Sequence, residues 1–143
     1  MGPGGPPRRA DLGDGIARRD GKDWPVPGDS HQGPKAMLIN GMAGSGGDMF
    51  PWLFRHHQLG KLIGTRTWGG LVGTLGYPAL MDGGYVTAPN VAIWTEDGFI
   101  IENVGVHPDI EVEQTPAELI KGHDPQLEKA IEVVMDELRQ NPP

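Results

Sequence analysis

One serine in the 143-residue sequence stands in a glycine-rich stretch that could present it as a nucleophile. The stretch is Asn40-Gly-Met-Ala-Gly-Ser45-Gly-Gly-Asp48; the apolar run 36–39 precedes it, and residues 48–54 have the pattern of a helix. A short, continuous apolar run is typical of a strand buried on both faces. A serine between such a strand and a helix lies where free backbone N–H groups and the helix dipole favour a negative oxygen. The pattern predicts a position suited to acyl transfer; the plainer alternative is an ordinary turn residue.

The helix that follows Ser45 is expected to begin very close to the serine. Pro51 is tolerated only in the first turn of a helix, which places the start at about residues 46–47. Gly60 is expected to end the helix, directly after Leu59.

The rest of the pattern predicts short strands and a C-terminal helix. Residues 62–63 predict the next strand, and Asp124 and Pro125 are a typical N-cap and first residue of a helix. An apolar stripe at helical spacing supports that helix, with the members Leu127, Ala130, Ile131, Val134 and Leu138. Turn-forming sequences separate the predicted β segments, which lie around Val72 and at 77–81, 85–88, 91–94 and 99–102.

The composition fits one modest domain and excludes several kinds of site. Lys and Arg number 12 against 19 Asp and Glu, and the net charge of −7 disfavours nucleic acid or an anionic membrane as a partner. No apolar run approaches the roughly 18 residues of a membrane helix. Without cysteine the chain has no disulfide, thiolate nucleophile or cysteine-based zinc site. Residues 1–15 are rich in glycine and proline and are expected to be disordered.

The stretch around Ser45 resembles the nucleophile segment of the tricorn-type serine peptidases. More remotely, it resembles that of the carboxy-terminal processing (tail-specific) proteases, peptidase family S41. The resemblance covers about residues 16–143 and continues in order through Gly60-Lys-Leu-Ile-Gly-Thr-Arg-Thr-Trp-Gly-Gly70, Asp82-Gly-Gly84, Glu102-Asn-Val-Gly-Val-His-Pro-Asp-Ile-Glu-Val112 and Gly122-His-Asp-Pro-Gln-Leu127. It implies an α/β fold, the crotonase/ClpP-like catalytic core, of which the chain would hold only the C-terminal portion.

One position separates the two catalytic designs of this family. In the tail-specific branch a lysine acts as general base, in a Phe-Gly-Lys-Gly-like stretch downstream of the serine. Here the stretch is Trp68-Gly69-Gly70-Leu71, and Gly70, which cannot take a proton, stands in the lysine's place. The resemblance therefore favours the tricorn-type Ser–His–Ser–Glu tetrad. Glu102, 57 residues after Ser45, matches the motif of its acidic member.

The resemblance implies acyl transfer without a metal or an organic cofactor. Ser45 would attack a peptide carbonyl after an imidazole takes its proton, and the Gly46 N–H would be one oxyanion donor. Glu102 would orient the imidazole through a serine hydroxyl. The implied substrate is a peptide or unfolded protein in cytoplasmic turnover, and tricorn relatives assemble as homo-oligomers. Asp20 is a candidate for the acidic residue that gives preference for basic side chains at the cleavage site; its alternative is a solvated loop aspartate.

The family's histidine and second oxyanion donor lie well upstream of the nucleophile, and only 44 residues precede Ser45. The chain is therefore expected to be the C-terminal part of a catalytic domain. By itself it should hydrolyse peptides very slowly or not at all, since a serine without a base is a poor nucleophile. His56 and His57 are adjacent, so their side chains point apart on a helix and do not favour a metal site. His107 and His123 are expected in turns rather than as a replacement base.

Two functions of other classes stay open from the sequence. A catalytically inactive fragment could serve as an oligomerisation or binding module. A fluorophosphonate probe separates this reading from the peptidase, because it labels an activated serine. A crotonase-like acyl-CoA enzyme would share the fold, but the matches at Ser45 and Glu102 argue against it.

Overall fold

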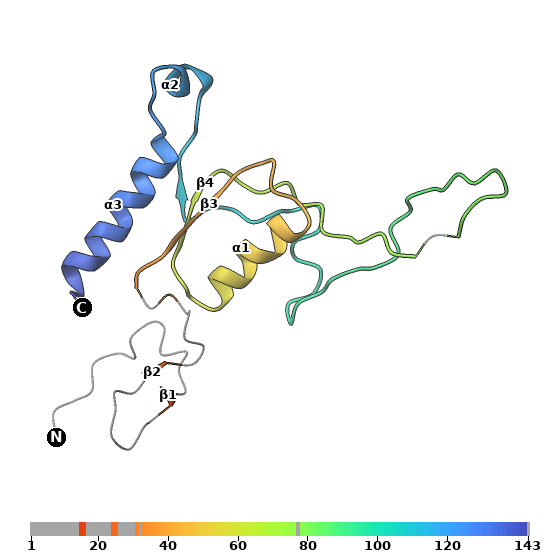
Figure 1. Ribbon diagram of the computed structural model, residues 1–143, viewed down its shortest axis with the longest axis horizontal. Helices are drawn as coiled ribbons and strands as arrows, with labels where there is room; N and C mark the ends of the chain where they lie inside the picture. Colours follow the sequence, from red (N-terminus) through yellow and green to blue (C-terminus); the bar gives the residue numbers. More distant parts are fainter. Residues whose placement is uncertain (1–14, 17–23, 26–30, 32, 77, 143) are drawn as a thin grey trace.

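The computed structural model describes residues 15–16, 24–25, 31, 33–76 and 78–142. At its centre is a parallel three-stranded sheet in the order β3-β4-β5, formed by Ala36–Ile39, Lys61–Gly64 and Ile110–Glu111. Helix α1 (Gly46–His56) lies on one face of the sheet and helix α3 (Pro125–Gln140) on the other (Figure 1). The predicted α/β class, with short strands and a C-terminal helix, is confirmed.

Strand β4 is the buried centre of the sheet. The parallel register pairs Met37 with Leu62 and Leu38 with Ile63. Leu62 belongs to the main hydrophobic cluster together with Phe54 of α1. Because successive side chains of a strand point to opposite faces, Ile63 faces α3. Leu62 and Ile63 are both 0% exposed, so the centre of β4 is covered on both faces, whereas Lys61 at its start is exposed.

Both predicted strands of this sheet are confirmed, with one correction. Residues 36–39 form β3, and residues 62–63 lie within β4. The expectation that β3 is buried on both faces is wrong, since Leu38 is 42% exposed and only Ile39 is fully buried. The reason is position: β3 is an outer strand of the described sheet, and α3 covers only part of it.

Helix α1 begins at Gly46, as predicted, with Ser45 as its N-cap. The reason given for this start is wrong, because Pro51 lies inside the helix, beyond its first turn. Its predicted end is wrong by one turn, because the helix stops at His56. Gln58 adopts a positive φ of 53°, which breaks the helix before Gly60 is reached.

Helix α3 begins as predicted, with Asp124 as N-cap and Pro125 as first residue. An oxygen of the Asp124 carboxylate accepts the N–H of Leu127 at 2.9 Å. The predicted apolar stripe is only partly buried, since Ala130 is 9% exposed but Leu127 and Ile131 are 47% and 54% exposed. The helix therefore presents part of its apolar surface to solvent.

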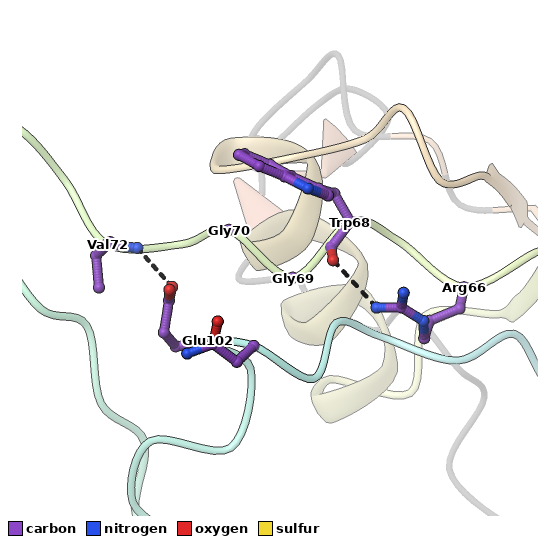
Figure 2. A pocket seen from close by; sticks show the side chains of 7 residues that line it. Arg66, Trp68, Gly69, Gly70, Val72 and Glu102 are labelled. Carbon is purple, nitrogen blue, oxygen red and sulfur yellow. Dashed lines mark hydrogen bonds between the residues drawn. The ribbon is translucent and has the colours of Figure 1, made fainter.

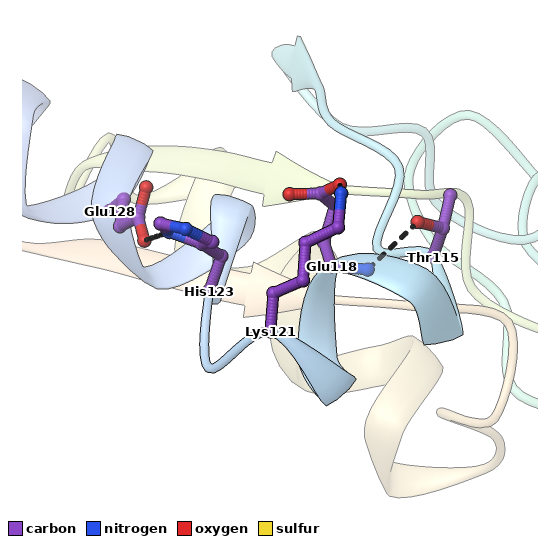
Figure 3. A network of polar contacts seen from close by, with 5 residues as sticks. All are labelled: Thr115, Glu118, Lys121, His123 and Glu128. Atoms are coloured by element: carbon purple, nitrogen blue, oxygen red, sulfur yellow. Dashed lines mark hydrogen bonds and ion pairs between the residues drawn. The ribbon is translucent and has the colours of Figure 1, made fainter.

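A short helix that the sequence pattern did not predict, α2 (Pro116–Ile120), precedes α3. Thr115 is its N-cap and accepts the N–H of Glu118 (Figure 3). An ion pair between Glu118 and Lys121 at 2.8 Å, and a polar contact between His123 and Glu128 at 3.4 Å, lie along the link from α2 to α3 (Figure 3).

Residues 72–76 and 78–100 form an arm that projects away from the sheet (Figure 1). In this projecting arm the predicted strands are wrong: its described residues contain only the isolated bridges Gly73–Val91 and Thr95–Gly98. A β pattern is stabilised by side chains on neighbouring strands, and the described chain offers this segment no such neighbour. The large apolar side chains more than half exposed here are Leu75, Met81, Tyr85, Val86, Trp94 and Phe99.

Before the sheet, Gly15–Ile16 (β1) and Trp24–Pro25 (β2) form a short antiparallel pair. The expectation of disorder concerns residues 1–15, of which 1–14 lie outside the described residues, as does Asp20. Within the described chain no helix is long and apolar enough to cross a membrane.

Candidate active site

Ser45 occupies the turn between β3 and α1 in a strained backbone conformation. Its φ is 54° and its ψ −111°. Such a conformation in a residue other than glycine costs on the order of 1–3 kcal/mol and persists only where the surroundings enforce it. The Ser45 N–H donates to the carbonyl of Gly70 at 2.9 Å, and its own carbonyl accepts the N–H of Asp48. Ser45 is exposed, and its side chain makes no capping bond, so the helix does not use its hydroxyl.

The first N–H of α1 is available beside that hydroxyl. The Gly47 N–H is bonded to the carbonyl of Gly44 at 2.8 Å, whereas Gly46 donates to no acceptor among the described residues. A Cβ placed on Gly46 would meet no atom within 4 Å, so the space in front of this backbone is open. The N-terminus of a helix carries positive partial charge, and the arrangement suits a negative oxygen next to Ser45.

Glu102 reaches the same region from the root of the projecting arm, where the chain returns to the sheet. One oxygen of its half-buried carboxylate accepts the N–H of Leu71 at 2.6 Å. The same oxygen accepts the N–H of Val72 at 2.8 Å (Figure 2). These two residues directly follow Gly70, which accepts the Ser45 N–H. The structure thus brings Ser45 and Glu102 to one short segment, although 57 residues separate them in sequence.

A cavity of about 300 Å³ opens beside this segment. Trp68, 64% exposed, contributes an aromatic side chain to it, and Glu102 contributes a carboxylate (Figure 2). Arg66 is held at its edge by bonds from Nη1 to the carbonyls of Trp68 and Val104 at 3.0 and 2.9 Å. The cavity thus places an aromatic surface next to charged groups, a combination that ligand pockets often have. The lining residues are Arg66, Trp68, Gly69, Gly70, Val72, Glu102 and Asn103.

The Trp68 indole lies directly against the turn that carries Ser45. A Cβ on Gly44 would come within 2.5 Å of Trp68 Cε3, and one on Gly70 within 2.4 Å of Trp68 Cζ3. Gly70 therefore does more than lack a basic group, because any side chain there would collide with the indole. Sequence reasoning did not single out Trp68 as a site residue; the glycines that follow it were the available signal.

Asp48 is a second residue that sequence reasoning did not place in the site. Its side chain is 0% exposed, and its two oxygens accept the N–H groups of Gly69 at 2.8 Å and Gly70 at 3.0 Å. The sequence shows an acidic residue in the first turn of a helix, which the helix dipole favours. Its partners lie more than 20 residues away, so no local pattern reveals them.

In the part of the chain that the structure describes, no hydrogen bond joins a histidine to Ser45. The same residues contain no group of three His, Asp or Glu side chains able to hold a metal ion. The histidines have other neighbours: Trp52 stacks on His56 at 4.8 Å, His56 meets His57 edge-on at 5.1 Å, Arg55 donates to the carbonyl of His107, and Glu128 pairs with His123 at 3.4 Å.

Comparison with known proteins adds to this geometry. The sequence model of peptidase family S41 matches residues 10–112. The chain belongs to peptidase family S41. The tricorn protease of Thermoplasma acidophilum is 46% identical over 122 residues, which are 85% of this chain and 11% of that protein. A Sulfurisphaera tokodaii protein named as a candidate C-terminal subunit of a tricorn-like protease is 44% identical over 126 residues, 87% of this chain and 15% of that protein.

A solved structure supports the same S41 assignment. The crystal structure of the tricorn protease matches this chain with a TM-score of 0.78 and 44% sequence identity, over 88% of this chain and 12% of that one. The predicted resemblance to tricorn-type peptidases is therefore confirmed. The chain spans less than a sixth of the length of these relatives.

Proposed function

We propose that this chain carries the nucleophile of a serine peptidase, with Ser45 forming an acyl-enzyme. The Ser45 oxygen bonds to the peptide carbonyl carbon as a base takes its proton. The C–N bond then breaks as the amine leaves with that proton, and water hydrolyses the ester. The observation that carries the proposal is the strained Ser45 backbone at the start of α1, next to the unbonded N–H of Gly46 and open space.

In this proposal Gly46 donates to the oxyanion, and Glu102 is the acidic member that supports a charged histidine. The position of Glu102 along the segment that also binds Ser45 favours the assignment. Asp20 is proposed to favour basic side chains at the cleavage site. No residue proposed here requires a metal or an organic cofactor.

The general base is proposed to be a histidine brought by other polypeptide, in a longer protein or on another chain. Two observations support this: no described histidine bonds to Ser45, and one relative is named for a C-terminal subunit. The proposed substrates are peptides or unfolded proteins in the cytoplasm, and the proposed assembly is a homo-oligomer, as expected from the family resemblance.

Fluorophosphonate labelling tests the proposal on the chain as it stands. The sequence contains two serines, Ser30 and Ser45, so Ser30 is an internal control for non-specific reaction. We expect slow labelling of Ser45 that rises when imidazole is added as a diffusible base, with no such rise at Ser30 when peptides are mapped by mass spectrometry. Ser45→Ala should abolish the imidazole-dependent signal. Equal labelling of the two serines with imidazole would contradict an activated Ser45.

A second candidate function is a non-catalytic binding or oligomerisation module. The exposed apolar side chains of the projecting arm favour it. Sedimentation velocity over a range of concentrations tests it together with the labelling. Self-association through the arm combined with an unreactive Ser45 would favour the module over the peptidase.

A further inference from the structure

Asp48 is a fully buried carboxylate whose two oxygens are both used by backbone N–H groups. It is the third residue of α1 and is 0% exposed. Its Oδ1 accepts the Gly69 N–H at 2.8 Å, and its Oδ2 accepts the Gly70 N–H at 3.0 Å. A buried charge is costly unless it is hydrogen-bonded, and bonds to an ionised acceptor are among the stronger ones. The Asp48 carboxylate therefore fixes the backbone at Gly69 and Gly70.

The segment held by Asp48 leads back to the nucleophile. The Gly70 carbonyl accepts the Ser45 N–H at 2.9 Å, and the Ala43 carbonyl accepts the Trp68 N–H at 2.8 Å. Residues 43–48 and 68–70 thus form a closed ring of bonds around the turn. This ring fixes the orientation of the peptide group that sets the positive φ of Ser45.

The same segment continues to Glu102. Four successive N–H groups, those of residues 69–72, donate to two carboxylates: the first two to Asp48 and the next two to Glu102. Asp48 holds the end of the segment nearest the nucleophile, and Glu102 holds the end nearest the arm. The spacing between Ser45 and Glu102 is therefore set through this segment.

We propose that Asp48 is a positioning residue of the peptidase reaction, which clamps Gly69 and Gly70 and so holds the Ser45 turn in its reactive conformation relative to Glu102. This inference rests on the proposed role of Ser45 as nucleophile. Asp48 does not touch the substrate; it acts through the Gly70 carbonyl. If Asp48 only stabilised the fold, its replacement would raise amide hydrogen exchange equally throughout the core.

Asp48→Asn tests the clamp with a side chain of nearly the same size. The amide can accept only one of the two N–H groups and turns its NH₂ donor toward the other. Asp109→Asn is the matched control, because the Asp109 carboxylate also accepts a backbone N–H, that of Leu62 at 2.8 Å, but lies outside the ring. Amide hydrogen exchange, followed by NMR, reads each site separately.

In Asp48→Asn we expect exchange at Ser45 and Gly70 to rise at least about 10-fold more than at Leu62 and Ile63 of β4. In Asp109→Asn, Ser45 and Gly70 should show no such excess. An equal rise throughout the core, or no rise at Ser45, overturns the proposal. If Asp48→Asn does not fold, exchange of the unmodified chain at low denaturant decides: the clamp requires the amides of Ser45, Gly69 and Gly70 to open together, and independent opening overturns it.

Imidazole-assisted fluorophosphonate labelling links the clamp to reactivity. Asp48→Asn should lower the Ser45 labelling rate about 10-fold at a temperature where the sheet is intact, whereas Asp109→Asn should not. Unchanged labelling in Asp48→Asn overturns the positioning role. If Ser45 does not react in the unmodified chain, the proposed nucleophile is overturned instead. The hydrogen-exchange experiment still tests the clamp in that case, because it does not depend on labelling.

Discussion

Strand β4 and the projecting arm both contain large apolar residues, but these side chains are buried in β4 and mostly exposed in the arm. Leu62 and Ile63 of β4 are 0% exposed, whereas Trp94 in the arm is 69% exposed and Met81 is fully exposed. β4 has a strand on either side and a helix on either face. The described part of the arm has two isolated bridges. Apolar sequence alone does not bury a segment; burial requires elements that cover both of its faces.

The candidate active site lies where these two regions meet. The turn at Ser45 connects β3 to α1, whereas Val72 and Glu102 lie at the two roots of the arm, where they are hydrogen-bonded to each other. The segment 69–72 joins the regions through bonds to Asp48 and Glu102. Substitutions should therefore cost much more free energy of unfolding on the sheet side of this segment than on the arm side.

The largest effect is expected from truncation at the centre of the sheet. Leu62→Ala should lower the free energy of unfolding by about 3 kcal/mol, because it removes buried methyl groups and leaves a cavity between β4 and α1. Leu80→Ala, the same change in the arm at a side chain 48% exposed, should cost no more than about 0.5 kcal/mol. Urea denaturation followed by circular dichroism measures both. Equal losses would show that the arm is as well packed as the sheet.

A smaller effect is expected at the junction, where two glycines differ in surroundings. Gly70→Ala should destabilise the chain by about 2 kcal/mol, since its Cβ would collide with the Trp68 indole at 2.4 Å. Gly46→Ala, where a Cβ meets nothing within 4 Å, should be neutral or stabilising by up to about 0.5 kcal/mol. Denaturation together with tryptophan fluorescence checks the pair. A stable Gly70→Ala protein with unchanged fluorescence would show that the indole does not rest on the turn.

The sequence predicted the elements whose partners follow closely along the chain. β3, β4 and the start of α3 each have a local cause, which is an apolar run or the Asp124-Pro125 cap. The start of α1 was predicted correctly but from the wrong cause, since Pro51 lies inside the helix. The arm was mispredicted because a β pattern states which residues suit a strand and does not state whether a partner is present. The early end of α1 depends on the backbone of Gln58, which adopts a positive φ without being glycine.

The same distinction holds within the candidate site. Ser45 could be selected because a strand, a glycine turn and a helix follow one another directly, and the structure shows that sequence of elements. The place of Trp68 over Gly44 and the bonds from Asp48 to Gly69 depend on contacts between residues more than 20 positions apart. Such contacts follow from the packing of α1 on the sheet, and no periodic pattern in the sequence predicts them.

The smallest effect is expected from removal of most of the arm. Gly73 and Val91 are joined by bonds of 2.7 and 3.1 Å, so residues 75–89 can be replaced by a short glycine-containing turn without separating the roots. Because the deleted side chains are largely exposed, the free energy of unfolding should change by no more than about 0.6 kcal/mol, with some gain expected from the shorter loop. The denaturant m-value should also stay nearly constant, since it scales with the surface newly exposed on unfolding. A clear fall in the m-value, measured by urea titration of both chains, would show that the arm folds with the sheet and that the two regions are one cooperative unit.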